Sequence, residues 1–137
     1  MKNHLKRIAS PRSWKIDRKV SKWILRPTPG THRLDMGLPL GLILRDELKI
    51  IPSMDAVKKS LKANEILVDG QRRKDHRFMV GLFDVLSIPM LKKQYRLVFD
   101  AKGRLMVQEI RGAEVSLKPC KVVGKTVLPG NKMQFHL

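Results

Sequence analysis

The sequence has little cysteine, few aromatic side chains and few acidic residues. Its 137 residues include one cysteine, Cys120, which excludes an internal disulfide and is too few for a structural metal site. Aromatic residues make up 5% and charged residues 30%, so the core is small and a large multidomain enzyme is excluded. No run approaches the roughly 18 apolar residues of a membrane span, and no signal peptide is recognisable. We therefore expect a small cytosolic protein.

Basic residues dominate the charge: 29 Lys and Arg against 12 Asp and Glu give a net charge of +17. The excess is uneven, because residues 1–36 carry a net +8, residues 37–90 a net +2 and residues 91–137 a net +7. We interpret these segments as a basic arm, a folded module and a third region. A surface of this charge predicts a polyanionic partner such as a nucleic acid.

The arm, residues 1–36, has three prolines and no sustained apolar period, so we expect an extended segment that becomes ordered on phosphates. A merely solvated tail is the alternative, but Trp14, Trp23 and Ile24 are costly to leave in water. Two roles stay open for Trp14, stacking on RNA or packing against the protein. The candidate RNA-binding residues of the arm are Lys2, Lys6, Arg7, Arg12, Trp14, Lys15, Arg18, Lys19, Arg26, His32 and Arg33.

Two helices are predicted in residues 37–90. The apolar spacing of Leu40, Ile43, Leu44, Leu48 and Ile51 indicates an amphipathic helix of about three turns that Pro52 ends. Ser53 is a suitable N-cap for a second helix over residues 54–63.

A small antiparallel sheet follows these helices. Residues 66–68 and the basic run 71–74 flank Asp69-Gly70, a strong hairpin signal, and residues 82–88 are typical of a buried strand. The second helix and the hairpin are expected to form the walls of a shallow basic groove, unless their cations are ordinary solvated charges. The candidate RNA-binding residues of this module are Arg45, Lys49, Lys58, Lys59, Lys62, Arg72, Arg73 and Lys74.

The third region contains a further hairpin, with strands at 95–99 and 104–108 around Asp100-Ala101-Lys102-Gly103. Strands at 122–127 and 133–137 complete what we interpret as the opening of a small β-barrel. Because the last residues fall inside an apparent strand, we expect the chain to be a fragment. The predicted fold class is α+β.

Catalytic and metal sites are not predicted. Gly124-Lys125-Thr126 resembles the end of a phosphate-binding loop, but Pro119 stands where that motif needs glycine. The four histidines are isolated, and no carboxylate has an evident catalytic partner. We therefore expect no enzyme activity, no cofactor and no small-molecule substrate.

Several blocks of the sequence resemble a known family. The run His4-Leu5-Lys6-Arg7-Ile8-Ala9-Ser10-Pro11-Arg12-Ser13-Trp14 is similar to the N-terminal signature of the archaeal and eukaryotic type of small-subunit ribosomal protein four, the S-four-e family. Further blocks agree in order: residues 26–32, Leu38-Pro39-Leu40 with Leu44-Arg45-Asp46, Asp69-Gly70 with Phe83-Asp84-Val85, and residues 100–104 with 120–122. Thr31 departs from the family, which usually has proline there.

The resemblance implies a cytoplasmic structural protein of the small ribosomal subunit, whose partners are ribosomal RNA and neighbouring ribosomal proteins, with no membrane. It implies that residues 37–90 form an alpha-L RNA-binding module and that residues 91–137 begin a central barrel, which continues in the family beyond residue 137. It also implies RNA-facing roles, in the arm for Lys6, Arg7, Arg12, Trp14 and Lys15, and in the module for Arg45, Lys58 and Arg72.

Two other functions remain open. A regulatory or quality-control protein that binds RNA away from the ribosome would carry the same module and charge. An accessory domain of an RNA-modifying enzyme is less favoured, because no catalytic constellation follows the module. Membrane binding is the weakest interpretation, because the basic residues lack a coherent amphipathic helix.

Overall fold

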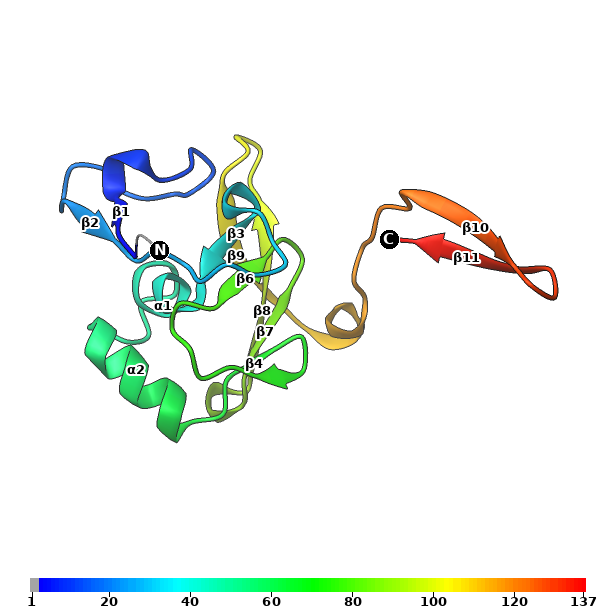
Figure 1. Ribbon diagram of the computed structural model, residues 1–137. Coiled ribbons are helices and arrows are strands. Elements are labelled where there is room, and N and C mark those ends of the chain that lie inside the picture. The colour runs from blue at the N-terminus through cyan, green and yellow to red at the C-terminus, as the bar shows by residue number, and fades with distance from the viewer. Residues whose placement is uncertain (1–2) are drawn as a thin grey trace.

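An antiparallel sheet of five strands, in the order β5-β4-β7-β8-β9, forms the centre of the molecule (Figure 1). The computed structural model describes residues 3–137. The strands are β4 (Leu67–Val68), β5 (Gln71–Arg72), β7 (Val85–Ile88), β8 (Lys93–Phe99) and β9 (Leu105–Ile110). Along β8, Tyr95 and Leu97 are buried while their neighbours are more exposed, the alternation expected of a strand with one face on the core. The fold is α+β, as predicted.

The helix α2 (Met54–Ala63) confirms the predicted second helix at both ends. The Ser53 hydroxyl accepts a hydrogen bond from the Ala56 amide at 3.2 Å, which caps the first turn. Val57 and Leu61 are fully buried and attach the helix to the core.

The predicted first helix is shorter than expected. It consists of α1 (Leu40–Leu42), continued by a π-helical turn, η3 (Ile43–Glu47). The Leu48 amide donates to the Ile43 carbonyl at 2.9 Å, and Lys49 then takes a left-handed conformation with φ of 52°. The prediction that this helix reaches Ile51 is therefore wrong in its last turn, because the left-handed residue ends it after Leu48.

The strand predicted at 82–88 starts later, at Val85. Residues 82–84 form a tight turn, in which Phe83 has a φ of 66° and the Asp84 carboxylate accepts the Gly81 amide at 2.7 Å. Before this turn, β6 (Met79–Gly81) pairs with β3 (Gly37–Pro39) in a separate two-stranded sheet. A carboxylate that binds the backbone locally has replaced strand pairing here.

The described part of the arm is folded, which corrects the prediction of an extended segment. Strands β1 (Leu5–Lys6) and β2 (Trp23–Ile24) pair with each other, and the 3-10 turns η1 (Arg7–Ala9) and η2 (Leu34–Met36) lie along the same segment. Trp14 and Ile24 are only 2% and 8% exposed. Burial of these apolar side chains attaches the arm to the body of the protein.

The main sheet continues across residue 90, the predicted end of the folded module. The 3-10 turn η4 (Pro89–Leu91) leads from β7 directly into β8, and the two strands pair from Val85–Arg96 to Ile88–Lys93. The hairpin β8–β9 is therefore part of the central sheet and does not form a barrel with the last two strands.

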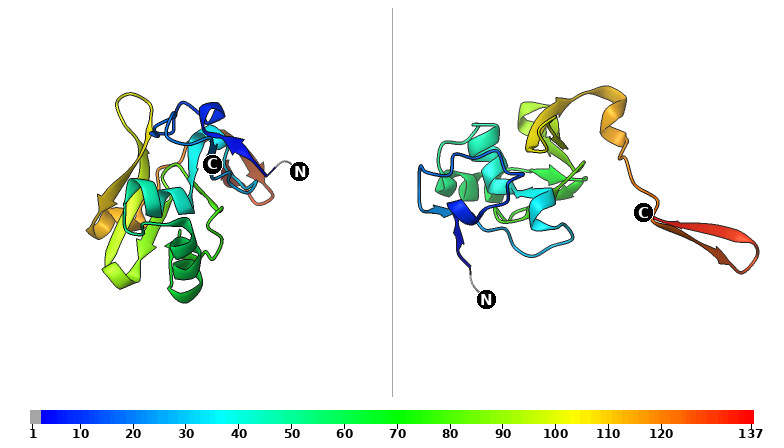
Figure 2. Two further views of the ribbon diagram at one scale, coloured as in Figure 1. Left: turned by 90° about the vertical axis from the view of Figure 1, so that its left-hand side faces the viewer. Right: turned by 90° about the horizontal axis from the view of Figure 1, so that it is seen from above.

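The last two strands, β10 (Gly124–Leu128) and β11 (Lys132–His136), form a hairpin of their own. It follows the turn η5 (Gly112–Ser116) and extends away from the main sheet in Figure 1 and in the right-hand view of Figure 2. Within residues 3–137, no helix has the length and apolar character needed to cross a membrane.

Candidate nucleic-acid interface

Two adjoining hollows lie between the arm and the helical segment α1–η3. Their volumes are about 590 and 650 Å³, and both are lined by Lys15, Ile16, Asp17, Asp46 and Lys49. We call this pair of hollows the arm groove. The further cations that line it are Arg7, Arg12, Arg18, Arg45 and Arg104.

Some cations of the arm groove hold the arm together. Arg18 donates to the carbonyls of Ile8, Ser10 and Pro11, each at 3.0 Å. Arg7 donates to the Asp17 carbonyl at 2.9 Å. These guanidinium groups satisfy backbone carbonyls, so their first role is structural.

Arg45 is paired within the groove. It forms a two-pronged ion pair with the neighbouring Asp46, with nitrogen–oxygen distances of 2.6 and 2.9 Å. Arg12, Lys15 and Lys49 are exposed, and within residues 3–137 no ion pair is formed by any of the three. They are the cations best placed to meet phosphates.

Burial raises the pKa of the half-buried Glu47 carboxyl, although Lys15 and Lys49 oppose the shift. An acid whose pKa is raised by folding binds protons more readily in the folded state, so its ionisation destabilises the fold as the pH rises through 4.5 and above. We expect Glu47→Gln to raise the free energy of unfolding at pH 7, and this gain to vanish near pH 3. Urea denaturation at the two pH values measures it. An equal gain at both would contradict the titration of Glu47 as its cause.

A second basic surface joins α2 to the β4–β5 hairpin, and we call it the helix–hairpin patch. Arg72 donates to the Lys62 carbonyl at 3.1 Å, so the hairpin lies beside the C-terminal end of the helix. The two groups of cations that the sequence placed on separate elements are therefore adjacent. A hollow of about 360 Å³ lies next to Arg72, Arg73 and Lys74.

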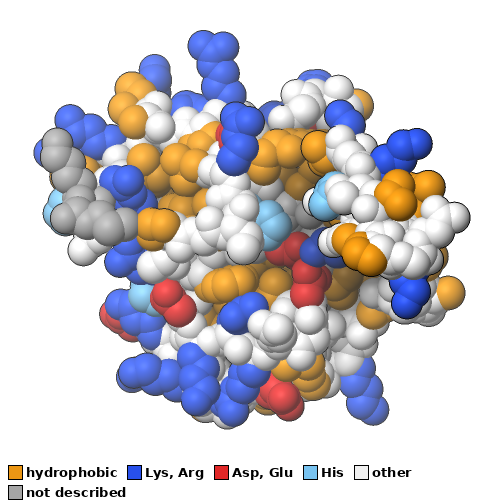
Figure 3. Space-filling model, turned by 45° about the vertical axis from the view of Figure 1, so that its right-hand side comes forward, with side chains coloured by type: hydrophobic (Ala, Val, Ile, Leu, Met, Phe, Trp, Pro, Cys, Tyr) orange, Lys and Arg blue, Asp and Glu red, His pale blue; other side chains and the backbone are white. Residues whose placement is uncertain are grey.

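Some cations of the helix–hairpin patch are held by partners within the protein, and others are exposed to solvent. Lys58 pairs with Asp55 at 3.0 Å. The Arg73 guanidinium lies 4.3 Å above the Phe78 ring and donates to Gln71 at 2.6 Å, which holds it against the hairpin. Lys59, Lys62 and Lys74 extend into solvent. On the face shown in Figure 3, many Lys and Arg side chains lie around the edge, and the centre combines apolar side chains with a group of acidic and histidine side chains.

The structure places Trp14 in the protein core, in agreement with the packing alternative. Its indole is 2% exposed, and Nε1 donates to the Leu34 carbonyl at 3.2 Å. A ring enclosed in this way offers no face to a base.

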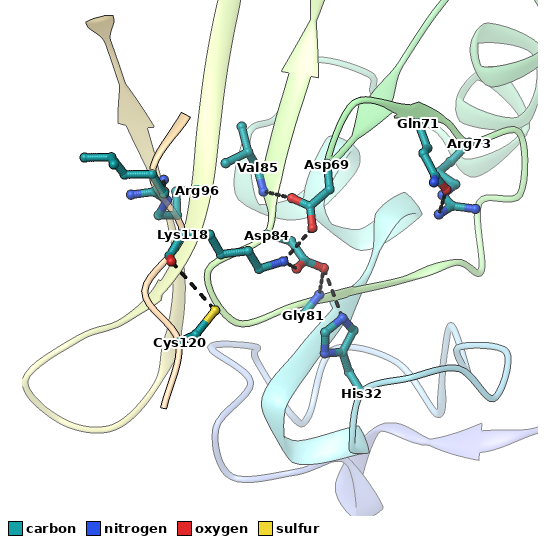
Figure 4. A network of polar contacts seen from close by, with 11 residues as sticks. His32, Asp69, Gln71, Arg73, Gly81, Asp84, Val85, Arg96, Lys118 and Cys120 are labelled. Atoms are coloured by element: carbon teal, nitrogen blue, oxygen red, sulfur yellow. Dashed lines mark hydrogen bonds and ion pairs between the residues drawn. The ribbon is translucent and has the colours of Figure 1, made fainter. Parts of the chain in front are cut away.

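His32 turns towards the protein interior. Its Nε2 lies 3.2 Å from the Asp84 carboxylate, and its ring covers Gly81, where a Cβ would lie 2.3 Å from ring atoms (Figure 4). The polar contact of His32 in this structure is internal, and its predicted contact with RNA stays a prediction. The remaining arm candidates are dispersed: Lys6 and Lys19 are exposed, Arg26 donates to the His4 carbonyl, Arg33 pairs with Asp35, and Lys2 lies outside the described residues.

Asp84, Asp69 and Lys118 form a cluster that we call the Asp84 clamp. Lys118, from the segment that leads to β10, donates to Asp84 at 2.6 Å and to Asp69 at 2.5 Å (Figure 4). Burial raises the pKa of Asp69, but hydrogen bonds from Lys118 and the Val85 amide outweigh it, and the net pKa is lowered. Burial also lowers the pKa of Lys118, and its two carboxylate partners reverse that into a net increase. The clamp attaches the segment between η5 and β10 to the main sheet.

Two residues in these sites were missed from the sequence. Arg104 reaches the arm groove because Trp14 and Leu105 form a bridge between segments far apart in the chain, which no local pattern signals. Asp84 did leave a signal, since a single carboxylate inside an apolar run indicates a buried group with partners. Within residues 3–137, no three His, Cys, Asp or Glu side chains gather as metal ligands.

The fold and surface together define a class of small basic α+β proteins whose exposed cations suit a polyanion. Two family descriptions match the chain, the RS4NT (NUC023) domain over residues 1–35 and the ribosomal family S4e over residues 91–137. The small ribosomal subunit protein eS4 of Methanocella arvoryzae is 46% identical over 98% of this chain and 57% of the relative. That of Archaeoglobus fulgidus is 45% identical over 98% of this chain and 56% of the relative.

A solved structure agrees with these matches. The crystal structure of the 30S ribosomal protein S4e from Thermoplasma acidophilum is similar with a TM-score of 0.56 and 30% identity, over 73% of this chain and 51% of that one. The chain is similar to proteins of the ribosomal S4e family. It spans about half the length of the curated relatives it matches.

Proposed function

We propose that the chain is a structural, non-catalytic component of the small ribosomal subunit in the cytoplasm, where it binds ribosomal RNA beside neighbouring ribosomal proteins. The observation that carries the proposal is the similarity to eS4 proteins over 98% of the chain. The net charge of +17 supports an RNA partner, because cations that neutralise phosphates release condensed counterions.

The proposed binding mode uses two surfaces. Arg12, Lys15 and Lys49 of the arm groove meet one stretch of sugar-phosphate backbone, and the helix–hairpin patch, as part of an alpha-L module over residues 37–90, meets another. Residues 1–36 then act as a docked basic extension, and residues 91–137 as the start of a further domain. A-form RNA is recognised mainly through shape and backbone, which suits surfaces rich in lysine and poor in exposed aromatics.

The test is the salt dependence of binding to small-subunit ribosomal RNA. Replacing Arg12 and Lys15 together by alanine is expected to make the slope of log K against log salt shallower by about 1.4–1.8, because each lost phosphate contact contributes about 0.7–0.9. Substitution keeps Trp14 and Ile24 in the core, whereas removal of residues 1–36 would take both away.

The matched control removes two cations that already face a carboxylate. Lys93 and Arg111 lie 3.5 and 2.9 Å from Glu109, so their joint replacement by alanine is expected to leave the slope nearly unchanged. Equal slopes for the two double variants would contradict binding through the arm groove. If ribosomal RNA and an unrelated duplex of equal length bind alike, the proposal fails in favour of an RNA-binding role away from the ribosome.

A further inference from the structure

Trp23 is a large aromatic side chain that the fold leaves in water. It is the first residue of β2, and it is 50% exposed, whereas the next residue, Ile24, is 8% exposed. Successive side chains of a strand point to opposite faces, so Ile24 attaches β2 to the core and Trp23 points outwards. The ring lines neither the arm groove nor the hollow of the helix–hairpin patch. The surfaces described above therefore do not account for it.

Two lysines border the Trp23 ring. Lys6 is the cross-strand partner of Trp23 in the β1–β2 pair, so the two side chains lie on the same face of that pair. The Lys22 ammonium group lies 5.3 Å from the centre of the indole ring. Both lysines are exposed, and within residues 3–137 neither forms an ion pair. Both cations are therefore available to an anionic partner beside the ring.

The contacts that the Trp23 ring makes are weak ones. The ring of His4 lies 5.4 Å away between centroids and is inclined by 46°, so the two rings are tilted and are not stacked face to face. The contact with Lys22 is an exposed cation–π contact, which is weaker than the stacking of a nucleobase on an aromatic ring. A base can therefore replace the Lys22 ammonium group over the indole, and that group is then available to a phosphate.

The combination of ring and cations decides between kinds of partner. A fully paired RNA helix hides the faces of its bases, so it would engage the lysines and leave the indole uncovered. An unpaired nucleotide satisfies both features, because its base has a π face and its phosphates carry the charge. An acidic protein segment would do so as well, but it would be a second ligand for a chain already proposed to bind ribosomal RNA. The unpaired nucleotide is the partner that the proposed function already supplies.

We propose that Trp23 stacks on one unpaired base of RNA, while Lys6 and Lys22 meet the phosphates on either side of that base. The inference rests on the proposed function and deepens it, because the arm groove meets only the backbone, whereas Trp23 selects places where a base lies outside a helix. Aromatic side chains recognise loops and bulges of RNA in this way. Every base has a π face, so the site favours a structural feature of RNA over a particular sequence.

The test compares two hairpin RNAs that differ in one base. The first carries a single unpaired adenosine as a bulge, and the second has an abasic ribose at the same place, so both have the same number of phosphates. The full chain is expected to bind the bulged RNA at least about fivefold more tightly than the abasic RNA, the lower end of what one stacked base contributes. Trp14 is buried and is the only other tryptophan, so quenching of the tryptophan fluorescence by the bulged RNA reports on Trp23.

Three variants assign the effect to the ring. Trp23→Leu is expected to abolish both the preference for the bulged RNA and the quenching. Trp23→Tyr keeps an aromatic ring and is expected to retain part of the preference, which separates loss of stacking from loss of folding. The matched control is Phe135→Leu, the same kind of change at an aromatic side chain of β11 that is 55% exposed, and it is expected to keep the full preference.

Equal affinity of the unaltered chain for the two RNAs overturns the proposal and, as long as both bind, leaves the proposed RNA-binding function in place. An equal loss of affinity for both RNAs in Trp23→Leu also overturns it, because the ring would then act through the fold and not on a base. A Trp23→Leu variant that keeps the RNA preference but enters reconstituted small subunits poorly would assign the ring to a neighbouring protein. The salt slope of the Arg12 and Lys15 variant tests the proposed function separately.

Discussion

Replacing Trp14 by alanine is expected to lower the free energy of unfolding by about 3–5 kcal/mol, the usual range for a large aromatic removed from a core. The indole is 2% exposed, and its Nε1 satisfies the Leu34 carbonyl. The adjacent Ser13 carbonyl accepts the Leu105 amide at 2.6 Å, so the same turn attaches the arm to β9. Loss of the ring therefore has two effects: it removes buried apolar surface, and it weakens the attachment of the arm to β9.

Trp23 provides the matched control, because it lies in the same arm but is 50% exposed. Its ring contacts are with His4 at 5.4 Å and Lys22 at 5.3 Å, both near the surface. Trp23→Ala is expected to cost less than about 1 kcal/mol. Urea denaturation of both variants gives the comparison. Similar losses for the two would show that the arm is not attached to the body through Trp14.

Asp84→Ala is expected to lower the free energy of unfolding by about 2–3 kcal/mol, because it leaves a buried backbone donor without a partner. The Asp84 side chain is 4% exposed and accepts the Gly81 amide at 2.7 Å. Lys118 keeps Asp69 as a partner in the variant, which limits the loss. Asp84→Asn retains an acceptor for the Gly81 amide and is expected to cost less than the alanine variant.

Asp35→Ala serves as the control for this prediction. Asp35 is about half exposed and pairs with the exposed Arg33 at 3.0 Å. Surface ion pairs of this kind contribute little to stability, so the free energy of unfolding is expected to change by no more than about 0.5 kcal/mol. The comparison is made by urea denaturation at pH 7. A loss for Asp84→Ala no larger than that for Asp35→Ala would show that the clamp does not stabilise the fold.

Local signals in the sequence predicted local structure well. Ser53 and the apolar spacing after it are sufficient to define α2, because a capped helix is specified by residues within a few turns. The apolar stripe of the first helix correctly predicted burial of Ile43 and Leu44. It did not predict the π-helical turn or the left-handed Lys49, which depend on how the chain packs after it leaves the helix.

Long-range contacts account for the features of the fold that the sequence did not predict. The arm was predicted to be extended because its sequence has no periodicity, but its order comes from Trp14 and Ile24 entering a core made by distant segments. In the helix–hairpin patch the sequence identified the cations, and the contact between Arg72 and the Lys62 carbonyl shows that they are adjacent. The function of the surface cations stays a prediction, since charge identifies a kind of partner and not a particular RNA.

The Asp84 clamp also limits how far the C-terminal hairpin can travel. With Lys118 held by Asp69 and Asp84, only residues 119–123 separate the attachment point from the first residue of β10. A fully extended segment of that length spans at most about 20 Å. The first residue of β10 therefore stays within about this distance of Lys118, so a partner bound to the hairpin is held at a high effective concentration near the main sheet.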